Sequence, residues 1–293
     1  MTKVVCWNIN KRHAPWRELV KMADAGDADV ALLQEAGNPP WDIETDVDTG
    51  PSESWDSRVW NADYEKLWGK EKLRERWGRA GLYDRWCKVV KLSNCVEVEW
   101  FKQISPISGV ANDEIAVSGI GTIAAACVTP KVPQDGEPFI VVSMYARWLR
   151  WHPTVKSPWS VGTSDGSAHR ILAAGDLNMI YNPGDPEWIR SRDNSVWTRM
   201  NAMGLEFMGP CYPNGRKAFN QRDWLAPNSL NVPTYYTVGE KTAEAASQQL
   251  DYAFASRGFH KSVRVRAMNE VDEWGPSDHC RLLIEVGASS GAR

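Results

Sequence analysis

The sequence predicts an α/β protein in which two β-sheets pack against each other and helices lie outside them. About ten short segments are apolar, or alternate between apolar and polar residues, as strands do, and few helical segments separate them. Strands and helices therefore do not alternate as they would in a doubly wound parallel sheet. The chain of 293 residues is 43% hydrophobic and 24% charged, which excludes collagen-like, coiled-coil and disordered proteins.

The chain begins with an expected strand, helix and strand. Lys3–Ile9 has the pattern of a buried strand, and Pro15 suits the first turn of a helix that Gly26-Asp27 ends. Val30–Gln34 is the next apolar strand, and residues 96–100 alternate with the period of two that a strand shows. Further strands are predicted at 114–118, 121–128, 138–145 and 170–175, followed by a helix at 186–203 and strands at 234–237, 249–255, 262–268 and 280–286.

We expect one domain over residues 1–287, interrupted by a tryptophan-rich insert at about 37–112, and a flexible tail at 288–293. Seven of the 16 tryptophans lie between Trp41 and Trp100. Either they pack inside the protein, or they form a surface that stacks flat groups such as bases or sugars. Basic residues interleave with acidic ones at 66–91, which indicates either a solvated helical face or a clamp for single-stranded nucleic acid.

Charge and cysteine content limit the partners and the location. The net charge is −3, so the chain lacks the basic character of domains that hold duplex nucleic acid through its phosphates. A phosphate-bearing substrate would then depend on metal ions for positive charge. Six cysteines without a CxxC pair favour a reducing compartment. We see neither a signal peptide nor a membrane span, and we expect a cytoplasmic protein.

Polar residues stand at the ends of several predicted strands. Taken singly, such residues are more often turns, caps or solvated side chains than catalytic groups. They occur here as an ordered set of short motifs across almost the whole chain: Trp7-Asn8, Leu33-Gln34-Glu35, Tyr145, Gly175-Asp176-Leu177-Asn178, Leu250-Asp251-Tyr252 and Ser277-Asp278-His279.

This ordered set resembles the endonuclease/exonuclease/phosphatase superfamily, which includes DNase I and the AP endonucleases. The resemblance implies a four-layer α/β/β/α sandwich with two packed mixed sheets, and a site at the rim where strand ends from both sheets meet. It also implies hydrolysis of a phosphate ester with a divalent metal, Mg²⁺ or alternatively Mn²⁺. The residue types suit this chemistry, because carboxylate and amide oxygens are the ligands that Mg²⁺ prefers.

The resemblance also implies roles for single residues. Glu35, Asp278 and Asn10 would hold the metal, with Asn8 close by. Asp176 and Asn178 would activate and orient the attacking water, although the sequence leaves open which group takes the proton. The full catalytic set would be Asn8, Tyr145, Asp176, Asn178, Asp251 and His279. Within this set Asp251 would orient His279, so that the imidazolium faces the phosphoryl oxygens.

A candidate substrate surface follows the strand that ends at Tyr145. Arg147 would clamp a phosphate and Trp148 would stack a base, unless this segment merely packs on the sandwich. The favoured function is a metal-dependent phosphodiesterase, a nuclease acting on DNA or RNA. The alternatives are a phosphatase or phosphodiesterase for a small or lipid phosphate, and a binding protein without catalysis. We expect a monomer, the default for this fold.

Overall fold

The computed structural model describes residues 1–50, 87–101, 123–145, 170–179, 196–220 and 229–288. The predicted strand at 114–118, most of the tryptophan-rich insert and the tail lie outside the described residues. The same holds for the two substrate-binding candidates, Arg147 and Trp148. In the part of the chain that is described, no helix is long and apolar enough to cross a membrane.

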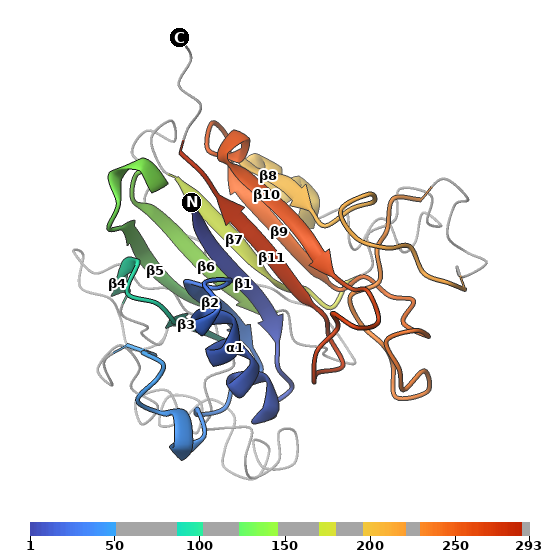
Figure 1. Ribbon diagram of the computed structural model, residues 1–293. Helices are drawn as coiled ribbons and strands as arrows, with labels where there is room; N and C mark the ends of the chain where they lie inside the picture. Colours follow the sequence, from blue (N-terminus) through green and yellow to red (C-terminus); the bar gives the residue numbers. More distant parts are fainter. Residues whose placement is uncertain (51–86, 102–122, 146–169, 180–195, 221–228, 289–293) are drawn as a thin grey trace, which may run out of the picture.

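Five of the described strands form the first sheet, in the order β10-β11-β1-β2-β3. β1 runs parallel to β2, and its other neighbour, β11, is antiparallel to it. Helix α1 (Ala14–Asp24) lies across β1 and β2 (Figure 1) and buries Trp16 and Leu19 against the outer face of this sheet. The strand bounds are β1 Thr2–Asn8, β2 Val30–Gln34, β3 Cys87–Lys91, β10 Val263–Met268 and β11 Arg281–Val286.

Six of the described strands form the second sheet, in the order β4-β5-β6-β7-β9-β8. Its outer face carries a cluster of aromatic rings, in which Trp197 from the helical residues 196–202 packs on Tyr252 and Phe254. The strands are β4 Val96–Trp100, β5 Ile123–Pro130, β6 Phe139–Tyr145, β7 Ile171–Asp176, β8 Leu205–Gly209 and β9 Asp251–Ser256. Short 3₁₀ helices are η1 Trp41–Ile43, η3 Pro133–Asp135 and η4 His260–Ser262.

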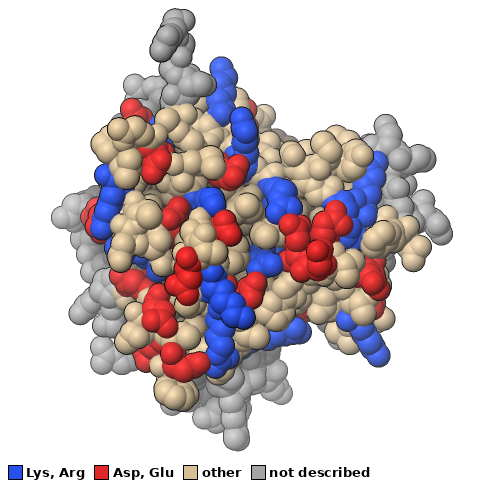
Figure 2. Space-filling view, in the orientation of Figure 1, with Lys and Arg blue, Asp and Glu red and all other residues tan. Residues whose placement is uncertain are grey.

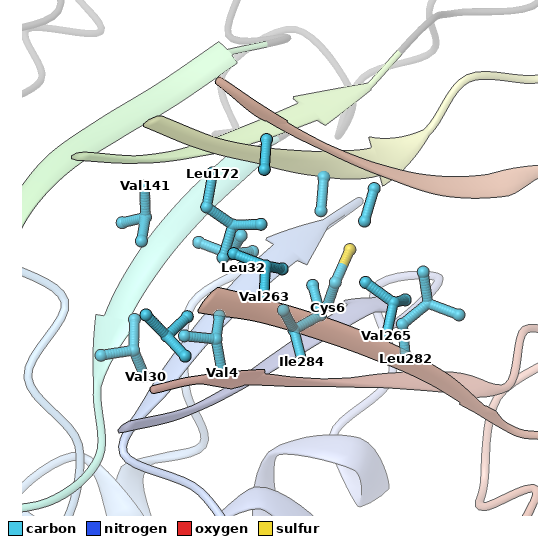
Figure 3. Close-up of a cluster of buried hydrophobic side chains, with 14 of the residues drawn as sticks. Val4, Cys6, Val30, Leu32, Val141, Leu172, Val263, Val265, Leu282 and Ile284 are labelled. Atoms are coloured by element: carbon cyan, nitrogen blue, oxygen red, sulfur yellow. The ribbon is translucent and has the colours of Figure 1, made fainter. Parts of the chain in front are cut away.

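The core lies between the two sheets. Val4 and Leu32 of the first sheet face Val141 and Leu172 of the second in one continuous apolar cluster (Figure 3). The prediction of two packed sheets flanked by few helices is thereby confirmed. The two buried faces explain why the inner strands are nearly continuous apolar runs rather than alternating ones.

Two of the described strands, β3 and β8, are not predicted by the sequence pattern, and one strand predicted within the described residues does not form. β3 is a short Val-Val pair between lysines, and β8 directly follows a helix, so neither stood out by periodicity. The predicted strand at 234–237 is reduced to isolated bridges at Tyr235, which pairs with Gln248 and with His279. This segment therefore crosses the rim of the sheets instead of extending one of them.

The register of the strands sets the position of the polar residues. In the parallel pair β1–β2, Asn8 lies opposite Gln34, the residue before Glu35. In the second sheet Tyr145 and Asp251 both lie opposite Asp176. The ends of β1, β2, β6 and β7 and the start of β9 therefore meet at one rim.

A glycine allows the close pairing of β6 and β7 at this rim. A Cβ atom on Gly175 would lie 1.7 Å from the carbonyl oxygen of Met144. No side chain fits in that space, so only glycine permits this approach one residue before Asp176.

Candidate active site

Half-buried polar residues form the first of two groups at the rim, which we call the outer cluster: Glu35, Tyr145, Asn10 and Asp278. The Tyr145 hydroxyl donates a hydrogen bond to Glu35 Oε1 at 2.7 Å. The Asn10 amide donates to Asp278 Oδ2 at 2.9 Å. Both carboxylates are thus held by neutral donors and remain accessible from solvent.

Three buried titratable residues form the second group, the inner cluster: Asp176, Asp251 and His279, with exposed fractions of 1%, 1% and 4%. His279 Nδ1 lies 2.8 Å from Asp251 Oδ2, and His279 Nε2 lies 3.8 Å from Asp176 Oδ2. The imidazole therefore stands between two carboxylates. Asp251 accepts a hydrogen bond from His279 Nδ1, and the other ring nitrogen, His279 Nε2, faces Asp176.

Asn8 joins the two clusters. Its side-chain nitrogen lies 2.9 Å from Asp176 Oδ2 and 3.5 Å from Glu35 Oε1. Its side-chain oxygen accepts the backbone N–H of Asn10 at 3.0 Å. One buried amide thus connects carboxylates from both sheets and the turn that carries Asn10.

Asn178 completes the surroundings of Asp176. Its backbone N–H donates to Asp176 Oδ1 at 2.8 Å, and its side-chain nitrogen lies 3.2 Å from Asp176 Oδ2. The carboxylate is therefore held in one orientation by the residue two positions further along the chain. Every predicted catalytic and metal-binding residue lies in or beside the two clusters, whereas Arg147 and Trp148 fall outside the described residues.

Burial and charge set the protonation states of the inner cluster. Burial raises the pKa of Asp176 to about 7, although the nearby His279 opposes this shift. Burial alone would lower the pKa of His279, but Asp251 and Asp176 outweigh it and raise that pKa to about 9. At neutral pH the cluster therefore holds an imidazolium beside a carboxyl group that readily exchanges its proton.

Three site residues adopt the left-handed backbone conformation: Asn10 (φ 45°), Glu35 (φ 46°) and Asn178 (φ 47°). Asparagine tolerates this region, but glutamate rarely adopts it. Such conformations persist where the surrounding structure imposes them, and they concentrate at functional sites. Here they turn the chain sharply after β1, β2 and β7.

Three further residues support the inner cluster, in roles that the sequence pattern does not predict. The buried Thr234 accepts the backbone N–H of Asp251 on its Oγ1 at 3.1 Å. The Trp7 indole donates to the carbonyl oxygen of His279 at 2.8 Å. The Tyr235 ring packs on the imidazole, with 4.7 Å between centroids.

The donor set of the outer cluster suits a hard divalent cation. Both side-chain hydrogen bonds of Glu35 to described residues use Oε1, which leaves Oε2 available as a ligand. Asp278 offers a second carboxylate, and such oxygen sets are what Mg²⁺ takes. The inner cluster also brings three ligand atoms within 4.8 Å of one another. However, His279 Nδ1 already shares a hydrogen bond with Asp251, which favours a proton-transferring role for the inner cluster over metal binding.

Comparisons with known proteins agree with the architecture. No family model matches the sequence, and no curated protein does either. Solved structures do match: the AP endonuclease LMAP from Leishmania major has a TM-score of 0.55 at 14% identity, covering 98% of this chain and 87% of that one. The APE2 catalytic domain from Xenopus laevis has a TM-score of 0.53 at 15% identity, with 99% and 94% covered.

These matches define a class of fold: two packed mixed sheets with few helices, the DNase I-like fold. An endonuclease/exonuclease/phosphatase family protein from Bacteroides thetaiotaomicron shares it, with a TM-score of 0.53, 14% identity and 98% and 97% of the two chains covered. The chain therefore has the fold of the superfamily that its motifs resemble. At this identity the likeness establishes the fold alone.

Proposed function

We propose that this protein is a divalent-metal-dependent phosphodiesterase that hydrolyses phosphodiester bonds in nucleic acid. The observation that carries the proposal is the Asn8 amide, which lies within hydrogen-bonding distance of both Glu35 and Asp176. A metal-ligand carboxylate and a carboxylate with a pKa of about 7 are thereby held side by side. Structures described as AP endonucleases share the fold, which supports a substrate of this class.

In this mechanism Glu35, Asp278 and Asn10 would hold the cation, and the cation would supply positive charge to the phosphate oxygens. Asp176 accepts the proton of the attacking water, since its pKa near 7 matches the working pH of a general base. Asn178 fixes the orientation of Asp176. The His279 imidazolium, oriented by Asp251, faces the charge that develops on the phosphoryl group.

Tyr145 and Asn8 complete the proposed site as positioning groups. The Tyr145 phenol is a neutral donor near pH 7 and holds Glu35 for the metal. Asn8 keeps Glu35 and Asp176 at a constant separation, which in-line attack on a metal-held phosphate requires.

A phosphatase or phosphodiesterase for a small or lipid phosphate is the second candidate. The net charge of −3 and the mixed charges in Figure 2 favour it, because this face shows no broad basic surface among its described residues. A binding protein without catalysis is the third candidate. Each described catalytic position holds a residue that could perform its proposed role, and this disfavours the third candidate.

A substrate panel tests the proposal. Purified protein would be incubated with single- and double-stranded DNA, RNA, an abasic duplex, bis-p-nitrophenyl phosphate and inositol phosphates, each with Mg²⁺, Mn²⁺ or EDTA. We expect metal-dependent cleavage of nucleic acid and of the small diester. Cleavage of inositol phosphates alone would favour the second candidate, and no turnover on any substrate would leave only the third.

A further inference from the structure

Beside the rim, the loop after β8 displays aromatic side chains that the catalytic chemistry does not use. Phe219 is 66% exposed and Tyr212 is 47% exposed. Each ring has a cation over it: Arg216 lies 4.7 Å from the Phe219 centroid, and Lys217 lies 5.0 Å from the Tyr212 centroid. We call these two rings and their cations the aromatic platform. In Figure 1 the gold-to-orange loops that follow β8 project to one side of the sheets.

The platform is a built feature, because Arg216 is buried beneath an exposed ring. The Arg216 side chain donates to the carbonyl oxygens of Asn269 (2.6 Å), Lys217 (3.4 Å) and Ala243. Its guanidinium is therefore fixed by backbone acceptors and is committed to supporting Phe219 rather than to binding a free anion. This cation covers one face of the Phe219 ring, and the side chain as a whole remains 66% exposed.

Hydrogen bonds connect the platform to the inner cluster. Asn269 accepts the backbone N–H of Arg216 on its side-chain oxygen and donates to the carbonyl oxygen of Pro233. Pro233 precedes Thr234, whose hydroxyl accepts the N–H of Asp251. On the other side of the loop, Gln249 donates to the carbonyl oxygen of Pro210 at 2.7 Å. The loop is thus anchored on both sides to the segments that position Asp251.

We propose that Tyr212 and Phe219 stack the unpaired bases of a single-stranded nucleic acid whose phosphodiester is cleaved at the rim. This inference rests on the proposed phosphodiesterase function and names its substrate class. Exposed aromatic rings with nearby cations bind single strands, because every base has a π face and the interaction tolerates any sequence. Bases in a duplex are already stacked on their neighbours, so they cannot use the platform.

Charge near the platform supports stacking over phosphate contacts. Glu270 and Glu244 interact electrostatically with Arg216, and their negative charges weaken the attraction of this region for a phosphate backbone. Stacking of a base on an aromatic side chain favours binding in addition to any contacts with the phosphates, and it tolerates any base. A single strand would therefore be held by its bases at the platform and by its reacting phosphate at the metal.

The test compares variants of Phe219 by fluorescence anisotropy, with labelled oligonucleotides of about 12 nucleotides, comparable to the site sizes of single-strand binders. EDTA is present to prevent cleavage. We expect Phe219→Ala and Phe219→Leu each to weaken single-strand binding at least about fivefold, and Phe219→Trp to retain it. Binding to a blunt duplex should not change. Val132→Ala serves as the control. Val132 is an exposed apolar residue between β5 and β6, before the start of β6, and so lies at the end of that strand away from the rim.

The outcomes separate this inference from the proposed function. If Phe219→Ala binds single strands like the wild type, or if duplex affinity falls equally, the platform proposal is wrong. Retained affinity in Phe219→Leu would also overturn it, since that pattern indicates a general apolar contact such as a protein partner makes. Turnover of bis-p-nitrophenyl phosphate with Mg²⁺ by the wild-type protein tests the proposed function separately from the platform.

Discussion

The inner and outer clusters lie at the same rim but differ in burial and in the groups that hold them. Asp176, Asp251 and His279 are almost completely buried, and the His279 imidazole contacts both carboxyl groups. Glu35 and Asp278 are half-buried and accept hydrogen bonds from the neutral donors Tyr145 and Asn10. Burial strengthens electrostatic interactions and shifts pKa values, whereas solvent access allows ligands to exchange.

We infer from this difference that the two clusters have separate roles, with proton transfer in the inner cluster and metal binding in the outer cluster. A proton-transferring group benefits from a fixed, water-poor environment, and the pKa of about 7 for Asp176 arises from burial. A Mg²⁺ site benefits from accessible oxygens, because the ion keeps several waters and binds substrate phosphate directly. Four substitutions test whether the two clusters really have these separate roles.

Asp176→Asn should have the largest effect. The amide keeps the shape of the side chain but cannot accept the proton of water, so kcat should fall at least about 100-fold. Steady-state kinetics on the best substrate of the panel would measure this, with Asp24→Asn at the exposed end of α1 as the matched control. Turnover like that of the wild type would remove Asp176 from the mechanism.

Glu35→Gln should weaken metal binding more than it lowers the rate of the chemical step at saturating metal. Loss of the charged ligand should raise the Mg²⁺ concentration needed for half-maximal activity about 10- to 100-fold, and excess metal should restore part of the rate. Asp176→Asn should show no such recovery. Equal recovery in both variants would contradict the separation of the clusters.

Asp251→Asn should change the titration of His279 in the metal-free protein. In the wild type the imidazole should titrate near pH 9, because Asp251 and Asp176 stabilise its charged form against the effect of burial. Without the Asp251 charge, its pKa should fall toward the ordinary value of about 6.5. NMR of the ¹⁵N-labelled imidazole measures this directly. An unchanged titration would mean that Asp251 does not hold the charge on His279.

Tyr145→Phe should have the smallest effect. It removes one neutral donor to Glu35 Oε1 and leaves both clusters otherwise intact. We expect a rise of at most about tenfold in the Mg²⁺ requirement, with kcat nearly unchanged, because supporting hydrogen bonds tune ligand orientation. A loss of kcat as large as that of Asp176→Asn would show that the phenol acts on the reacting phosphate instead.

Much of this site was predictable from the sequence, because strand ends share a rim. Asn8, Glu35, Tyr145 and Asp176 each end or directly follow an apolar run, and parallel pairing brings these ends together. The burial of each carboxylate was not predictable, because it depends on packing between segments distant in sequence. Thr234 illustrates this: it looked like part of a strand, yet its hydroxyl supports Asp251 across the rim.

The left-handed turn at Glu35 has a consequence for how this protein balances stability against activity. A non-glycine residue in this conformation costs about 1 to 2 kcal/mol of folding free energy, and a glycine there would relieve it. Glycine, however, would remove the carboxylate on which metal binding is proposed to depend. Selection for thermal stability alone would therefore act against this residue, and its retention would have to come from selection on function.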